Sequence, residues 1–184
     1  MNDDERRHAQ TIDRLLKDRI ILLGTPIDDR TAENVLAQFL YLLDTDEGSP
    51  IFLYINSPGG SVAASFAILD MMRQSAAPIT TTCVGVASGM AALILASGTR
   101  GQRFALPHAE MRITQLSIGR SVLTQTAEQE RERRRLESMV VSHLAEAASR
   151  TEEMVRADMR SELYLDAYRA KRYGLIDEII KASK

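Results

Sequence analysis

The sequence is poor in the residues that support several common kinds of site. Its 184 residues include one cysteine, Cys83, which excludes an internal disulfide, and only three histidines. No cluster of histidine, cysteine, aspartate and glutamate has metal-ligand spacing, so neither a metal site nor a cofactor is expected. The net charge of −2 gives no reason to expect nucleic acid or an anionic membrane as a partner.

Long apolar stretches are also missing. The most apolar run, residues 84–96, is shorter than the roughly 20 residues that span a bilayer. The first ten residues are charged and lack the apolar core of a signal peptide, and we expect them to form a mobile polar tail. The lone cysteine fits a reducing compartment, so a cytoplasmic protein is the expectation.

The order of the elements predicts one α/β domain. A chain of this length can bury a core without a disulfide or metal. Expected strands are 19–23, 51–55, 79–84, 104–106 and 111–115, and expected helices are 31–43, 62–73, 87–96 and a long charged one over 121–153. Asp28 or Asp29 can cap the first helix. Residues 173–177 predict a closing turn with a last short strand. Strands that alternate with helices predict a largely parallel sheet with right-handed crossovers.

A turn with two glycines separates the second strand from its helix. Residues 56–61 read Asn-Ser-Pro-Gly-Gly-Ser. Glycines let the backbone approach a ligand closely, and free amides at a helix start can stabilise an oxyanion. Taken alone, a Gly-Gly pair is more typical of a tight left-handed connection. The turn therefore indicates an oxyanion site only in combination with other motifs.

That turn, residues 56–62, resembles the signature of the ClpP family, the proteolytic subunits of ATP-dependent Clp protease. Segments 15–20, 103–107 and 173–177 also resemble the family, so the likeness covers nearly the whole chain. It implies a single ClpP-like domain, 1–184, with a ClpP/crotonase-like α/β fold.

The resemblance also implies a division of the chain. Residues 1–18 would form an axial tail and N-terminal segment, 19–114 and 154–184 the head, and 115–153 a protruding strand–helix handle. It further implies heptameric rings, stacked in pairs as a tetradecamer, that dock to an AAA+ unfoldase of the ClpX, ClpC or ClpA type.

Each catalytic position of the family holds a different residue here. Gly89 stands where the family has its serine, Thr114 where it has histidine, and Glu162 where it has aspartate. A glutamate could still orient a histidine, but a threonine cannot take a proton from a serine. Gly60 and Met90 match the family's oxyanion-hole positions. The resemblance therefore implies a degenerate triad beside a retained oxyanion hole.

Few other residues could replace the missing catalytic serine and histidine. Ser88 is an alternative nucleophile, but one step along the expected helix would turn its hydroxyl about 100° away from the family's serine position. His8 lies in the tail and His143 far along the long helix. His108 precedes Thr114 by six residues, roughly 20 Å if that stretch is extended. The sequence thus predicts no base where one is needed.

The leading interpretation is a non-catalytic ring subunit, similar to the ClpR subunits of cyanobacteria and plastids, that assembles with an active paralogue. One alternative is an active serine endopeptidase that uses Ser88. Another is a homomeric assembly that holds a ligand in a crotonase-like pocket.

Two further expectations concern peptides and partners. The family's unfoldase-docking groove maps onto Leu40, Tyr41, Phe52 and Tyr54, although Phe52 and Tyr54 fit one face of a strand equally well. The expected handle strand, residues 117–122, keeps one glycine where the family is glycine-rich, which implies poorer peptide docking.

Overall fold

The structure is a computed structural model that describes residues 3–116 and 126–181. The strands are β1 (Ile20–Leu23), β2 (Ile51–Ser57), β3 (Ile79–Ser88), β4 (Arg103–Ala105), β5 (Glu110–Ile113), β6 (Leu163–Asp166) and β7 (Glu178–Ile179). The helices are α1 (Asp3–Lys17), α2 (Asp29–Thr45), α3 (Val62–Gln74), α4 (Met90–Ala96), α5 (Ala127–Ala148), α6 (Glu152–Arg160) and α7 (Ala167–Tyr173). The expected α/β fold is confirmed.

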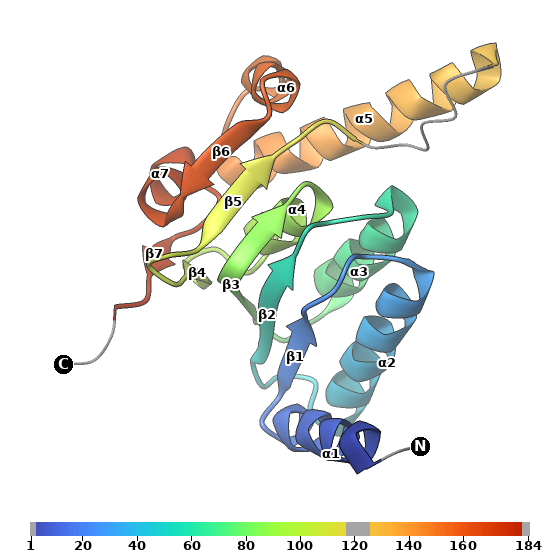
Figure 1. Cartoon of the computed structure of the whole chain (residues 1–184), viewed down its shortest axis with the longest axis vertical. Helices are drawn as coiled ribbons and strands as arrows, with labels where there is room; N and C mark the ends of the chain where they lie inside the picture. The colour runs from blue at the N-terminus through green and yellow to red at the C-terminus, as the bar shows by residue number, and fades with distance from the viewer. Residues whose placement is uncertain (1–2, 117–125, 182–184) are drawn as a thin grey trace.

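The sheet divides at β3. Strands β1, β2, β3, β4 and β7 lie in that order and are all parallel. The first half of β3, residues 81–83, pairs with β4, and its second half, residues 86–88, pairs with β5. Strand β6 then pairs antiparallel with β5. The end of β3 is therefore the point where the main sheet and the β5–β6 pair meet (Figure 1).

Alternation along the strands builds the core. Ile51, Leu53 and Ile55 of β2 are completely buried, while the residues between them are more exposed. Helices α2 and α3 run alongside β1 and β2 on one side of the sheet (Figure 1). All seven residues of α4 are buried, which makes this helix the centre of the hydrophobic core.

The predicted cap of α2 is confirmed at the first of its two candidates. The Asp28 carboxylate accepts a hydrogen bond from the Thr31 amide at 2.7 Å. This bond satisfies one of the free amides of the first turn, and it lowers the pKa of Asp28.

The prediction of a mobile tail at residues 1–10 is wrong where the structure describes them, because residues 3–17 form α1. This segment is rich in charged residues, but its arginine, glutamine, glutamate and leucine residues are good helix formers. Leu16 near the helix end packs against the core. An axial role for residues 1–18 stays a prediction.

The prediction of one continuous helix to residue 153 is also wrong. Helix α5 ends at Ala148, and Ser149 takes a left-handed conformation with φ 54°. The Arg150 amide then donates to the Ala145 carbonyl at 2.8 Å, as in a Schellman motif, and Thr151 caps the new helix α6. Residues 117–125, which include the expected handle strand, lie outside the described residues. The N-terminal half of α5 projects from the body of the molecule (Figure 1).

One buried arginine joins the ends of several elements. The Arg103 guanidinium donates to the carbonyls of Ala96, Ala147 and Gly174, and its Nε donates to Asp177 at 2.9 Å. Asp177 in turn accepts from the Arg103 amide. These bonds satisfy carbonyls at the ends of α4, α5 and α7 that the helices themselves leave without partners.

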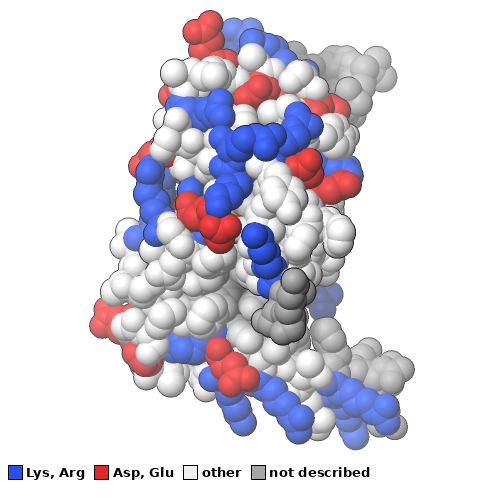
Figure 2. All heavy atoms as spheres, turned by 90° about the vertical axis from the view of Figure 1, so that its left-hand side faces the viewer, with Lys and Arg blue, Asp and Glu red and all other residues white. Residues whose placement is uncertain are grey.

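The outer surface matches the balanced composition. Lysine and arginine are interspersed with aspartate and glutamate over the face shown in Figure 2. Within residues 3–116 and 126–181, no helix is both long enough and apolar enough to cross a bilayer.

Candidate functional site

The turn from β3 to α4 holds the first of the predicted site positions. Strand β3 continues to Ser88, so the prediction that a helix begins at residue 87 is wrong, and α4 begins at Met90. Gly89 between them has φ 55° and ψ −118°. A sharp strand-to-helix turn of this kind presents the nucleophile in many serine hydrolases. Here the turn presents a glycine, which has no side chain.

Two of the three predicted triad positions meet at this turn. A Cβ built on Gly89 would lie 3.2 Å from Thr114 Oγ1. The third position, Glu162, directly precedes β6, whose first residue Leu163 is opposite Ile113 of β5. Gly89 and Thr114, which are distant in sequence, therefore adjoin one another in the fold.

The chemistry available at these positions is limited. Gly89 has no nucleophile, and the Thr114 hydroxyl is a poor proton acceptor at neutral pH. Glu162 is exposed and has a left-handed backbone, φ 50°. A carboxylate in this position orients a histidine in a triad, and no histidine occupies position 114. Within the described residues, no hydrogen bond joins the Thr114 hydroxyl to Glu162 or to another base.

The Gly-Gly turn packs directly against the β3–α4 turn. A Cβ on Gly59 would lie 2.4 Å from the Ser88 carbonyl oxygen, so only glycine fits. The Ile27 amide donates to the Gly59 carbonyl at 2.9 Å and fixes the turn from the other side. Among the described residues, no acceptor pairs with the amides of Gly60 and Met90. Both predicted oxyanion-hole positions thus keep an available donor.

A substitution tests how closely the two turns pack. Gly59→Ala is expected to lower the free energy of unfolding by about 3 kcal/mol or more, because Gly59 combines a positive φ of 86° with the contact to Ser88. Gly101→Ala is the matched control, since Gly101 has φ 84° and open space around it. Gly101→Ala should lower the free energy of unfolding by only about 1–2 kcal/mol, because it adds the strain of a left-handed backbone but no clash. Equal losses in urea denaturation would contradict the packing of these turns.

Ser88 has a neighbour that sequence analysis missed. Ser88 pairs with Arg112 across β3 and β5, and directly paired residues face the same side of a sheet. Arginine has no lone pair to accept a proton. The Arg112 guanidinium lies 4.8 Å from the centroid of the Tyr164 ring and 3.2 Å from a Glu110 oxygen. Strand alternation predicts only that Arg112 and Thr114 lie on one side of their strand, and the adjacency of Arg112 to Ser88 depends on the pairing of β3 with β5.

The histidines lie elsewhere. His8 belongs to α1, and His108 is exposed in the turn between β4 and β5. His143 on α5 has Nδ1 2.9 Å from the Met139 carbonyl, and its ring packs edge-on against Phe66. In the described part of the chain, no histidine is hydrogen-bonded to a serine.

Cysteine chemistry at Cys83 is unavailable as well. This side chain is completely buried, and burial raises the pKa of its thiol to about 12. The thiol is therefore protonated at neutral pH. No three metal-ligand side chains gather anywhere in residues 3–116 or 126–181.

The four predicted docking residues do not form one patch within this chain. Leu40 and Tyr41 are more than half exposed on α2. Phe52 and Tyr54 alternate with the core residues of β2, so they face the side of the sheet that α2 does not cover. Leu22 of β1 is paired with Tyr54 and extends this apolar strip. A single docking surface made of all four stays a prediction.

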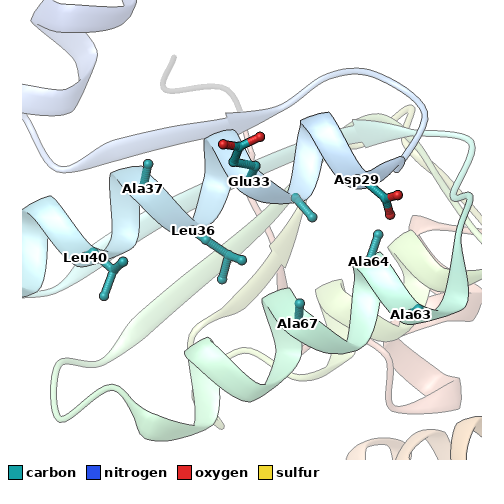
Figure 3. A pocket seen from close by; sticks show the side chains of 9 residues that line it. Asp29, Glu33, Leu36, Ala37, Leu40, Ala63, Ala64 and Ala67 are labelled. Atoms are coloured by element: carbon teal, nitrogen blue, oxygen red, sulfur yellow. The ribbon is translucent and has the colours of Figure 1, made fainter.

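Leu40 also borders an open groove of about 520 Å³ between α2 and α3 (Figure 3). Small side chains make most of its wall: Ala32, Ala37, Ala63, Ala64 and Ala67. Leu36 and Leu40 point toward α3, the Asp29 carboxylate lies at one end of the groove, and the Glu33 carboxylate points away from α3 (Figure 3). This apolar groove has no arrangement of groups suited to acid–base catalysis.

Comparison with known proteins agrees with the fold. The family model described as Clp protease matches residues 2–183. The ATP-dependent Clp protease proteolytic subunit 2 of Prochlorococcus marinus (strain NATL2A) is 42% identical over 170 residues, which cover 91% of this chain and 84% of that relative. The chain therefore belongs to the Clp protease family.

Proposed function

We propose that this chain is a non-catalytic subunit of a Clp-type proteolytic complex. The observation that carries the proposal is the pair of Gly89 and Thr114, which adjoin at the strand-to-helix turn without a nucleophile or a base. The chain contributes its fold to an assembly while another subunit supplies peptide hydrolysis.

The expected loss of catalytic turnover supports this proposal. Removing the triad of a serine protease lowers turnover by about a millionfold, and the remaining oxyanion and binding groups give about 10³–10⁴ over water. The free amides of Gly60 and Met90 therefore stabilise an oxyanion only if another group generates it.

Hydrolysis by the purified chain is the direct test. We expect no cleavage of casein or of a fluorogenic peptide, and no covalent labelling by a fluorophosphonate, since the residue paired with Ser88 is Arg112, which accepts no proton. Ser88→Ala should leave this background unchanged, and Ser142→Ala serves as a control at an exposed serine. Labelling that disappears only in Ser88→Ala would instead support an endopeptidase with a rearranged site.

Assembly is the second part of the proposal. We propose that the chain joins rings with an active subunit of the same family, that residues 115–153 act as a handle, and that an AAA+ unfoldase docks to the rings. The projecting half of α5 and the exposed Leu40, Tyr41 and Phe52 support these roles. Native mass spectrometry of the chain with active subunits from the same cell should detect mixed rings. Homomeric rings alone, with no partner found in the cell, would favour a homomeric binding assembly.

A further inference from the structure

A second hollow, of about 380 Å³, lies between α6, β6 and α7. Its apolar part includes Met154, Leu163 and Leu165. Met154 is 47% exposed, which leaves an apolar surface available to a ligand group. These three elements form the left side of Figure 1, and that side faces the viewer in Figure 2.

Arginines dominate the polar lining of this hollow. Arg150, Arg169 and Arg172 line it together with a single acidic residue, Asp158. Asp158 already accepts a hydrogen bond from the Tyr173 hydroxyl at 2.7 Å, and Arg150 stacks on the Tyr173 ring at 4.4 Å. The face shown in Figure 2 carries a run of lysine and arginine side chains above its middle. The lining therefore favours a negatively charged group.

Two of these arginines have their donors available. The side chains of Arg169 and Arg172 form no hydrogen bond or ion pair with any residue that the structure describes, whereas the intervening Lys171 pairs with Glu178 at 2.7 Å. Residues three apart on a helix lie on the same side, so both guanidinium groups can reach one ligand. A guanidinium matches the planar geometry of a carboxylate.

Strand β6 adds an unpaired edge to the apolar surface and the two arginines. It pairs with β5 and, within the described residues, with no other strand, so its second edge is open. An open edge binds an extended peptide through backbone hydrogen bonds, and alternate side chains of that peptide then face the same side. Leu163 and Leu165 also share one side of β6. A peptide uses all of these features, whereas a small carboxylate would use only the arginines.

We propose that α6, β6 and α7 form a binding site for an extended acidic peptide. One apolar side chain of the peptide contacts Met154 and Leu163, and a carboxylate two residues away pairs with Arg169 and Arg172. None of the triad positions lines this site, although Leu163 directly follows Glu162, and the proposal does not depend on the function proposed for the triad positions.

Fluorescence anisotropy with the full chain tests this site. The probe is a fluorescein-labelled peptide of sequence Ser-Leu-Ser-Asp-Ser-Leu-Ser, and its partner has asparagine in place of aspartate. We expect Arg169→Gln and Arg172→Gln each to weaken binding of the aspartate peptide by about tenfold, the usual effect of losing a charged hydrogen bond. The asparagine peptide should bind the unmodified chain about tenfold more weakly than the aspartate peptide does. Met154→Asp should weaken binding of the aspartate peptide too, through repulsion and loss of apolar contact.

Arg30→Gln on α2 is the matched control, because it removes the same charge from an exposed position outside the hollow. It should leave binding unchanged, and circular dichroism should show that all variants fold. Three results would overturn the proposal: equal binding of the two peptides, equal effects of Arg30→Gln and Arg169→Gln, or displacement of the probe by octanoate as effectively as by unlabelled peptide.

Discussion

A double variant, Gly89→Ser with Thr114→His, is expected to react covalently with a fluorophosphonate, whereas neither single variant should. Serine at 89 would supply a hydroxyl on the turn, and histidine at 114 would supply a base in contact with it, because the Gly89 Cβ position lies 3.2 Å from the Thr114 side chain. Glu162, which directly precedes β6, is the carboxylate that the family resemblance assigns to orienting the imidazole. A positioned base contributes about 10²–10⁴ in rate, so labelling should exceed that of Gly89→Ser by that factor.

The backbone at position 89 sets the stability of this variant. Gly89 has φ 55°, a conformation that costs a residue with a side chain about 1–3 kcal/mol. Thermal unfolding of Gly89→Ser, alone and combined with Thr114→His, would measure this cost separately from reactivity. If the single variant Gly89→Ser reacted as fast as the double variant, another group would be acting as the base, and the non-catalytic assignment would be wrong.

Asp177→Asn is expected to destabilise the fold by about 3 kcal/mol or more, since removing one partner strands the other as an uncompensated buried charge. The Arg103 side chain is only 7% exposed. Asparagine keeps the shape and one acceptor but removes the negative charge. Urea denaturation of both proteins would give the difference in free energy of unfolding.

The effect of Asp177 should also depend on pH. Hydrogen bonds from Arg103 hold the pKa of Asp177 below its ordinary value of 3.8. A lowered pKa stabilises the folded state at pH values above the ordinary one, and the contribution is lost as pH falls through the folded-state pKa. The stability difference between the unmodified chain and Asp177→Asn should therefore be constant above about pH 5 and shrink below about pH 4.

Glu178→Gln provides the comparison for Asp177. The Glu178 carboxylate pairs with Lys171 at 2.7 Å, but both side chains are largely exposed. An exposed pair contributes about 0–1 kcal/mol, so this variant should unfold almost like the unmodified chain. If both variants lost the same stability, the Arg103–Asp177 pair would not have the structural role inferred for it.

Periodic burial made the centre of the fold predictable. Apolar and exposed residues alternate along β2, and Val35, Phe39 and Leu42 recur at helical spacing on the buried side of α2. The sequence predicts no element over residues 154–172, where α6, β6 and α7 are all short. The sequence nevertheless contains local signals for the two ends of α7: Asp166 caps its start, and Gly174 ends it with φ 102°.

The break between α5 and α6 is harder to predict. Left-handed helix ends usually carry glycine or asparagine, and here the residue is Ser149. Gly174 helps to explain the position of the break, because its missing Cβ would lie 2.5 Å from the Ala148 carbonyl oxygen. A contact between segments so distant in the chain has no local pattern in the sequence.

The candidate site also has some features that the sequence predicts and others that depend on the tertiary fold. Residue identity indicates the lost chemistry of Gly89 and Thr114, and the family resemblance indicates their positions. The adjacency of Ser88 and Arg112 depends instead on the parallel pairing of β3 with β5, whose strands are joined through a helix and another strand. Pairing of this kind is set by the tertiary fold rather than by nearby sequence.

Helix α4 can act as a short rigid rod between two distant regions. Its seven residues span about 10 Å. Gly89 precedes one end, and the Ala96 carbonyl at the other end shares the Arg103 guanidinium with Ala147 near the end of α5. A displacement at the base of α5 must therefore either break one of these hydrogen bonds or shift α4 along with it. Mechanical force on the projecting helix would in this way reach the turn where the family keeps its serine.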